Sequence, residues 1–326
     1  MTRILVVHYS QSGQLDEVVR AFTGPLVDAP GIEVVFEAIA PEAPYPFPWP
    51  LLRFLDAFPE SVYEVPPAMR RSPLEDIRDP AARRFDLVIL AYQVWFLSPS
   101  LPVTGFLASQ LAAEVLRDTP VITLIACRNM WLMAQEKVKQ RLASLGATLC
   151  DNVALVDAAG GALSFVATPW WVLTGNKGPY LGGRIPAAGV APDEIAATAR
   201  FGRRIVACAA RGEISARTPL LAGLGAVKID SRLIASERIA HRSFRAWGAL
   251  IRALGPPGAF ARRPALAIYL LFLLTMIVTV VPVSALVTML LSPLSRARID
   301  RLRAHYAAPS GEACYGDAAM GLEAQR

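Results

Sequence analysis

Histidine and cysteine are scarce in this chain, which limits the catalytic and metal sites that it can build. Its 326 residues include three histidines and four cysteines. No metal-ligand spacing connects the cysteines, which a cytoplasmic domain should keep reduced: Cys127, Cys150, Cys208 and Cys314. The histidines are His8, His241 and His305. They give little support to a histidine-based triad, and no zinc-ligand pattern competes with other interpretations.

The sequence also lacks the patterns that would make its positive charge a sign of nucleic-acid binding. The net charge is +6, but the arginines gather in residues 213–263 and again after residue 295. These stretches flank an uncharged apolar run, where anionic lipid headgroups would meet them. We therefore expect a membrane, and not a nucleic acid, as the partner of the basic residues.

The chain opens with an apolar run that breaks into a polar loop. Residues 4–14 read ILVVHYSQSGQ, and the next stretch places Leu15, Val18, Val19 and Phe22 on one helical face. A buried strand that leads into a helix through such a loop is typical of nucleotide-binding α/β domains. The loop has neither the Gly-Lys-Ser/Thr ending of a P-loop nor the G-x-G-x-x-G fingerprint.

This loop resembles the FMN phosphate loop of flavodoxins. The expected phosphate-binding residues are Ser10, Gln11, Ser12, Gly13 and Gln14. Free backbone amides and the hydroxyls of Ser10 and Ser12 would hold the phosphate, and Gly13 would let the backbone approach it closely. Flavodoxins usually end this loop with Gly-Asn-Thr, whereas this chain has Gly-Gln-Leu and two acidic residues immediately after it. An ordinary strand-to-helix turn therefore remains the alternative.

Two further apolar strands end in loops that carry aromatic and polar side chains. They are predicted over residues 86–91 and 121–126, with helical periodicity between and after them. In a parallel sheet such loops open on one edge, where ligands bind. The second loop supplies Tyr92, Gln93, Val94, Trp95 and Phe96, and the third supplies Cys127, Arg128, Asn129, Met130 and Trp131. Planar side chains at this edge favour a flavin ring.

These elements predict one flavodoxin-like α/β domain over residues 1–212, with a doubly wound five-stranded parallel sheet. The remaining strands are expected over residues 31–39 and 152–156, and residues 192–211 suit the closing helix. Two insertions decorate the domain. Residues 41–67 are rich in proline and aromatics and predict an irregular apolar flap, while residues 158–191 carry a shorter apolar stretch.

The C-terminal third predicts membrane attachment. Residues 213–263 form a basic juxtamembrane segment, residues 264–294 carry no charge, and residues 295–326 form a basic-to-polar tail. The uncharged run exceeds the roughly 20 residues that cross a bilayer. Both a transmembrane span and a re-entrant segment bent at Pro282 fit it. No cleavable signal precedes the first strand, so the expected location is the cytoplasmic membrane with the domain facing the cytoplasm.

Four runs carry a closer resemblance, to the dialkylresorcinol condensing enzymes: VVHYSQSGQL, PYPFPWP, LAYQVWFLSPSLPVTGFL and TLIACRNMWLMAQEKVK. The similarity extends over nearly the whole chain. It implies a role in making lipid-tailed resorcinols from β-ketoacyl chains, together with a partner ketosynthase, and it leaves an acyl carrier protein as a further partner. The intermediate made with the ketosynthase is a cyclohexanedione acid.

The family is assigned to condensation or aromatisation, and the residues favour aromatisation. Claisen condensation needs an activated cysteine with suitable partners, which the spacing here does not supply. Aromatisation removes two electrons, which FMN can accept. On this hypothesis Trp95 and Trp131 wall the flavin ring, Arg128 holds the substrate carboxylate, and Tyr92 or His8 accepts a proton. A flavin phosphate or a local carboxylate would satisfy Arg128 equally well.

Two rival functions fit the same sequence. A membrane-bound NAD(P)H:quinone-type flavin oxidoreductase would also explain an anchor beside an apolar site. A cofactor-free scaffold that recruits the ketosynthase to the membrane would explain the departure of Gln14 and Leu15 from the flavodoxin loop.

Overall fold

The protein is built around a parallel sheet, as the computed structural model shows for residues 1–159, 163–215, 218–291 and 296–310. Five strands lie in the order β2-β1-β3-β5-β6, and all neighbouring pairs are parallel. Their bounds are β1 (Thr2–His8), β2 (Ile32–Ala38), β3 (Leu87–Trp95), β5 (Pro120–Cys127) and β6 (Thr148–Val156). This order is the flavodoxin-like doubly wound topology, so the predicted fold class is confirmed.

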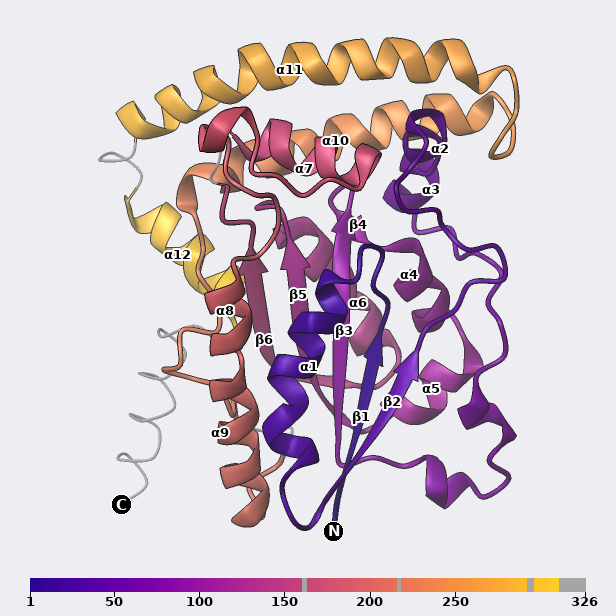
Figure 1. Ribbon diagram of the computed structural model, residues 1–326, viewed down its shortest axis with the longest axis vertical. Coiled ribbons are helices and arrows are strands. Elements are labelled where there is room, and N and C mark those ends of the chain that lie inside the picture. Colours follow the sequence, from indigo (N-terminus) through magenta and orange to yellow (C-terminus); the bar gives the residue numbers. More distant parts are fainter. Residues whose placement is uncertain (160–162, 216–217, 292–295, 311–326) are drawn as a thin grey trace.

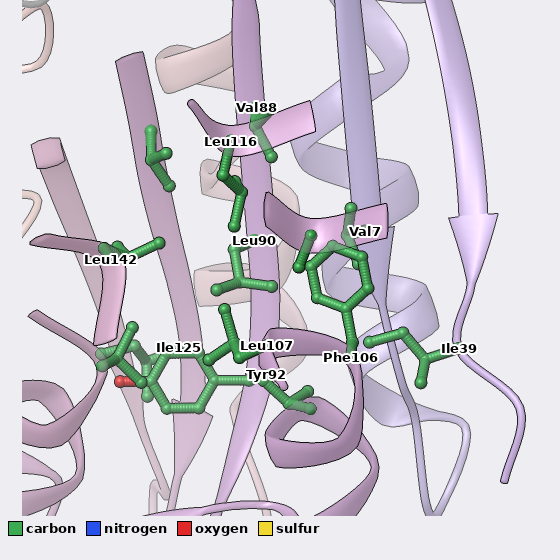
Figure 2. Packing of buried hydrophobic residues seen from close by; sticks show 14 of the residues in the cluster. Val7, Ile39, Val88, Leu90, Tyr92, Phe106, Leu107, Leu116, Ile125 and Leu142 are labelled. Carbon is green, nitrogen blue, oxygen red and sulfur yellow. The ribbon is translucent and has the colours of Figure 1, made fainter. Parts of the chain in front are cut away.

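The central strands are apolar along their length because both faces of the sheet are covered. In β1, Leu5 and Val7 enter one core cluster, while Ile4 and Val6 enter the other. All four side chains are fully buried. Figure 2 shows the first cluster, in which side chains from β3 meet those from the covering helices.

Two groups of helices cover the sheet (Figure 1). On one face pack α4 (Leu101–Leu107), α5 (Gln110–Leu116) and α6 (Leu132–Ser144). On the other pack α1 (Gln14–Val27), α8 (Pro192–Ala197) and α9 (Ala199–Ala210). The predicted first helix and closing helix are thereby confirmed, although the closing segment is two helices.

Both insertions contain short helices. The first carries α2 (Leu51–Asp56) and α3 (Phe58–Val62), and the 3-10 turns η1 (Pro73–Asp76) and η2 (Pro80–Arg83) then lead to β3. The second carries α7 (Ser164–Thr174) and η3 (Leu181–Gly183), while its residues 160–162 lie outside the described part of the chain. A two-residue strand, β4 (Ser98–Pro99), pairs with β3 and was not expected from the sequence.

The C-terminal third packs on the domain. The helices α10 (Ser231–Ala253) and α11 (Arg262–Leu291) form a hairpin across the carboxyl end of the sheet, and α12 (Arg296–Ala307) descends beside β6 (Figure 1). Residues beyond 212 complete both core clusters, among them Leu220 and Ile234. The segment 213–263 is therefore partly a long helix that contributes to the core.

Residues 264–291 of the apolar run lie in one continuous helix, which does not turn back at Pro282. By length and composition α11 qualifies as one membrane-crossing candidate, over Arg262–Thr279. Residues 292–295 and 311–326 lie outside the described part of the chain, and the second of these ranges includes Cys314.

Candidate functional site

A cavity of about 380 Å³ lies where the predicted loops converge, at the carboxyl ends of β1, β3 and β5. Its floor consists of residues from the three loops after these strands. Its walls come from the first insertion and α7, and its roof comes from α10 and α11. The lining is mostly apolar, and its polar groups are few. Such a cavity at the switch point of a doubly wound sheet is the expected ligand site of this fold.

The first loop, which borders this cavity, contains donors that have no acceptor among the described residues. Gly13 caps α1 with φ of 84°, and no side chain caps the helix. In the described residues the backbone N–H groups of residues 12–16 find no acceptor, because the first amide bond of the helix is from Glu17 to the Gly13 carbonyl. The Ser10 hydroxyl is buried and also has no partner there. Free amides and an orphaned hydroxyl at a helix N-terminus form an anion site.

The unusual Gln14 has a structural task in this loop. Its side-chain amide donates to the Val190 carbonyl at 3.1 Å, and its carbonyl oxygen accepts from the Val190 N–H at 3.0 Å. Gly189 allows this close approach, since a Cβ there would lie 2.5 Å from the Gln14 oxygen. Gln14 thus fastens the second insertion to the loop.

Gln11 joins the first loop to the second and to the flap. Its N–H donates to Gln93 Oε1 at 3.2 Å, and its side-chain amide donates to the Pro46 carbonyl at 2.6 Å. The Tyr9 hydroxyl donates to Gln11 Oε1 at 2.5 Å. These bonds fix the three segments as one wall of the cavity.

The second loop is a tight hairpin. Val94 and Trp95 pair with β4, and the two turn residues Phe96 and Leu97 have φ of 49° and 60°. Bulky residues rarely adopt positive φ, and such strain collects at functional sites. Trp95 lines the cavity and meets three aromatic rings edge-on at centroid distances of 5.1–6.1 Å, those of Tyr9, Tyr45 and Trp49.

Arg128, from the third loop, is the cation of the cavity. Its guanidinium lies 3.7 Å from the centre of the Phe165 ring. Within the described residues it forms no ion pair and donates no hydrogen bond. Burial lowers the pKa of Arg128 to about 10, although Asp157 opposes this shift, so the group is charged at neutral pH. A charged, unpaired guanidinium in an apolar cavity calls for an anionic ligand.

Asp157 stands beside Arg128 and was missed in the sequence. It follows β6 directly, lines the cavity, and accepts from Thr168 Oγ1 at 2.6 Å and from the Ala159 N–H at 2.7 Å. Its position at a strand end is the same signal that identified the other loops. The contributions of α7, α10 and α11 to the cavity had no such signal.

Ten of the predicted site residues line the cavity, and the other six do not. Lining the cavity are Gln11, Ser12, Gln14, Gln93, Val94, Trp95, Phe96, Cys127, Arg128 and Met130. Ser10 and Gly13 lie in the same loop but do not line it. Asn129 adjoins the cavity in the third loop, where its Oδ1 is buried without a partner in the described chain.

Three residues with predicted roles do not line the cavity. Tyr92 is fully buried in the core, where its hydroxyl donates to Gln135 Oε1 at 2.6 Å, so it does not reach the cavity as a proton acceptor (Figure 2). Trp131 is 2% exposed in the same cluster and does not wall the cavity. His8 pairs with Asp16 at 3.1 Å and likewise does not line the cavity. The alternation of side chains along β3 explains the burial of Tyr92, because successive side chains of a strand point to opposite faces of the sheet.

Cys127 lines the cavity as an inert thiol. Its Sγ contacts the Leu155 carbonyl at 3.6 Å, and burial raises its pKa well above the usual range. A thiol in this state is protonated at neutral pH and is a poor nucleophile. This agrees with the absence of a condensing-enzyme cysteine pattern in the sequence.

Comparisons with known proteins give no family. No protein-family model matches the chain, and no curated protein matches it. A flavoprotein in complex with FMN from Lactobacillus acidophilus matches at 12% identity and a TM-score of 0.37, over 47% of this chain and 93% of that one. A WrbA-like flavodoxin from Agrobacterium tumefaciens matches at 14% identity and a TM-score of 0.34, over 65% of this chain and 99% of that one. RosB with a bound formylriboflavin phosphate matches at 12% identity and a TM-score of 0.33, over 71% of this chain and 100% of that one. These low scores carry no argument, and the fold assignment rests on the strand order.

Proposed function

We propose that this protein is an FMN-dependent oxidoreductase that acts on an apolar substrate with a carboxylate group. The observation that carries the proposal is the cavity itself, which has free donors at the α1 loop and an unpaired guanidinium at Arg128. Each of these two places favours an anion, and the surface between them is apolar. FMN and an acidic substrate together supply two anionic groups and two apolar bodies.

The first loop fits the FMN phosphate. The N–H groups of residues 12–16 and the Ser10 hydroxyl would donate to its oxygens. The carboxylate of Asp16 faces His8 at 3.1 Å, which reduces its repulsion of a phosphate when the imidazole is protonated. The buried Leu15 supplies no hydroxyl, so this loop would use one fewer side-chain donor than flavodoxins.

Arg128 would bind and orient the substrate carboxylate. Its stacking on Phe165 fixes the plane of the guanidinium and leaves its N–H groups available. Asp157, held by Thr168, raises the pKa of Arg128 and so favours the protonated guanidinium. The apolar residues of α10 and α11 exclude water around the rest of the substrate.

The finer proposal is aromatisation of a cyclohexanedione acid in dialkylresorcinol biosynthesis, with a ketosynthase as partner. Its support is the sequence resemblance together with the acidic, apolar character expected of the ligand. Bound FMN supplies a two-electron acceptor for this step. The substrate anion loses its carboxylate as CO2 and a hydride from the ring, and the electron pair of the broken C–C bond remains in the neutral resorcinol.

Flavin binding is the first test. The purified protein is titrated with FMN and with riboflavin, and absorbance near the usual ~450 nm flavin band is followed through gel filtration. We expect FMN to bind at least tenfold more tightly than riboflavin, because riboflavin lacks the phosphate. Ser12→Glu should abolish this preference, and the exposed Ser144→Glu should not. Failure to bind FMN would refute the proposal and favour the cofactor-free scaffold.

The reaction is tested on the FMN-loaded protein with a dialkyl cyclohexanedione acid and an electron acceptor. We expect the resorcinol and CO2 in equal amounts. Oxidation of NADPH with a simple quinone, without turnover of the acid, would instead identify the protein as a quinone-type reductase.

A further inference from the structure

The outer face of α11, formed by Ile268, Leu271, Leu274, Thr275 and Val278, is apolar and exposed. Leu271 is 67% exposed and Val278 is 73% exposed. Even Thr275 offers no free donor, since its hydroxyl bonds to the Leu271 carbonyl at 2.9 Å. The opposite face packs on α10 and α2, with Leu266 and Tyr269 buried. A helix on a soluble surface would carry charges on its outer face, and none occurs from residue 264 to residue 294.

The apolar surface continues onto neighbouring segments at the same end of the molecule. In α7, Val166 is 52% exposed and Trp170 is 54% exposed, and Phe260 before α11 is 76% exposed. Figure 1 shows α7 and α11 at the carboxyl end of the sheet. Exposed tryptophan and phenylalanine beside a long apolar stripe are typical of membrane-interface segments.

Basic residues flank this surface at both ends of α11. Arg263 is exposed at its beginning, and Arg296 and Arg298 are exposed after its end. A helix of 30 residues is about 45 Å long, so the two charged groups lie far apart along one apolar stripe. This arrangement matches a membrane surface, where anionic headgroups surround the buried apolar stripe.

The same contacts oppose a transmembrane orientation. α10 runs antiparallel beside α11 and exposes Arg242, Arg245 and Arg252. If α11 crossed the bilayer in this arrangement, these arginines would enter the hydrocarbon, where a charged side chain is strongly disfavoured. In addition, Arg262 at the start of α11 is 1% exposed and pairs with Asp56 at 3.0 Å and Glu60 at 2.7 Å.

We infer that α11 and α7 lie in the plane of an anionic phospholipid bilayer, with the outer face of α11 inserted among the lipids and both ends of the helix on one side. The inner face of the same helix lines the cavity through Phe272, Leu273, Met276 and Ile277. In this orientation α11 lies between the bilayer and the cavity. A lipid-tailed substrate in the bilayer would then be one helix away from the cavity. The docking itself does not rest on the proposed flavin chemistry.

Vesicle flotation tests the docking. The full chain is mixed with vesicles of phosphatidylcholine and phosphatidylglycerol, and with vesicles of phosphatidylcholine alone. We expect flotation with the first and at least tenfold less with the second. Leu271→Glu with Val278→Glu should reduce flotation at least tenfold, whereas Val27→Glu, an exposed site at the end of α1, should not. Circular dichroism and the urea midpoint confirm that the variants fold.

Labelling distinguishes an in-plane helix from a spanning one. Arg263→Cys and Arg296→Cys are each reacted with a membrane-impermeant maleimide on intact vesicles carrying the protein outside. We expect both positions to react without detergent. Protection of one end until detergent is added would overturn the inference in favour of a span. A dimer that buries α11 in solution and does not float would overturn it in favour of a second copy of the chain.

Discussion

At the scale of single residues, the site depends on polar groups that have no partner among the described residues. Arg128 donates no hydrogen bond in the described chain, and the Ser10 hydroxyl has none either. Buried polar groups without partners are costly, so their retention indicates a ligand. The two groups lie in different loops, which allows the proposed flavin and substrate anions to be tested separately.

Replacement of Arg128 by methionine should cost about 100-fold in kcat/KM for the acidic substrate, since loss of a buried charge pair costs about 2–5 kcal/mol. FMN affinity should change less than threefold. Steady-state kinetics and FMN titration measure the two effects, with Arg203→Met, an exposed site on α9, as control. A loss of FMN affinity with riboflavin affinity unchanged would mean that Arg128 holds the flavin phosphate.

Gly189→Ala should disturb the contact between Gln14 and Val190. The new methyl group would lie 2.5 Å from the Gln14 oxygen, at a φ of 92°. We expect a loss of about 2–3 kcal/mol in unfolding free energy by urea denaturation. Gly182→Ala is the matched control, because it has a positive φ of 64° but open space, and should cost about 1 kcal/mol. Equal losses would show that backbone strain alone matters.

At the scale of elements, helices far apart in sequence hold one another in place. Glu237 of α10 is fully buried and accepts from the N–H of Met133 at 2.7 Å, in the first turn of α6. This contact fixes the start of α6, directly after the loop that carries Arg128. Burial raises the pKa of Glu237 to about 8, although hydrogen bonds from the backbone amides of Leu132 and Met133 oppose the shift.

The raised pKa of Glu237 predicts that the folded state loses stability as pH rises. The folded state retains a proton on Glu237 that the unfolded chain releases near its ordinary pKa of about 4.3, so stability should fall from about pH 4.3 to pH 8. Glu237→Gln should remove this component and be more stable than the wild type at pH 8.5. Urea denaturation of both proteins at pH 5 and pH 8.5 measures this change in unfolding free energy. A wild-type slope that persists in the variant would assign the titration to another group.

The ion cluster at the start of α11 fastens the helical roof to the flap. Arg262→Met leaves Asp56 and Glu60 without their partner and should cost about 3–5 kcal/mol in stability. The roof should also become sensitive to limited proteolysis between α10 and α11. Arg263→Met, at the exposed neighbouring position, should cost less than about 0.5 kcal/mol. Equal proteolysis of both variants would show that the cluster does not hold the roof.

At the scale of the whole molecule, the chain covers its own site. The cavity combines loops of the sheet with walls from both insertions and a roof from the C-terminal third. The tail closes the assembly, since the Ser310 hydroxyl bonds to Asp151 at 2.7 Å on β6. Removal of the C-terminal third would therefore expose the cavity as well as the core.

Local sequence patterns were enough to predict the sheet, its loops and the apolar character of α11. Continuous apolar runs predict buried parallel strands, and the ends of such strands identify Arg128 and the phosphate loop from local pattern alone. Tertiary structure decided which face each side chain takes, so that Tyr92 and Trp131 entered the core while Asp157 reached the cavity. Tertiary structure also determined that α11 packs along the domain. The packing of α11 on α10 and the pairing of Arg262 are contacts between distant segments, which no local pattern encodes.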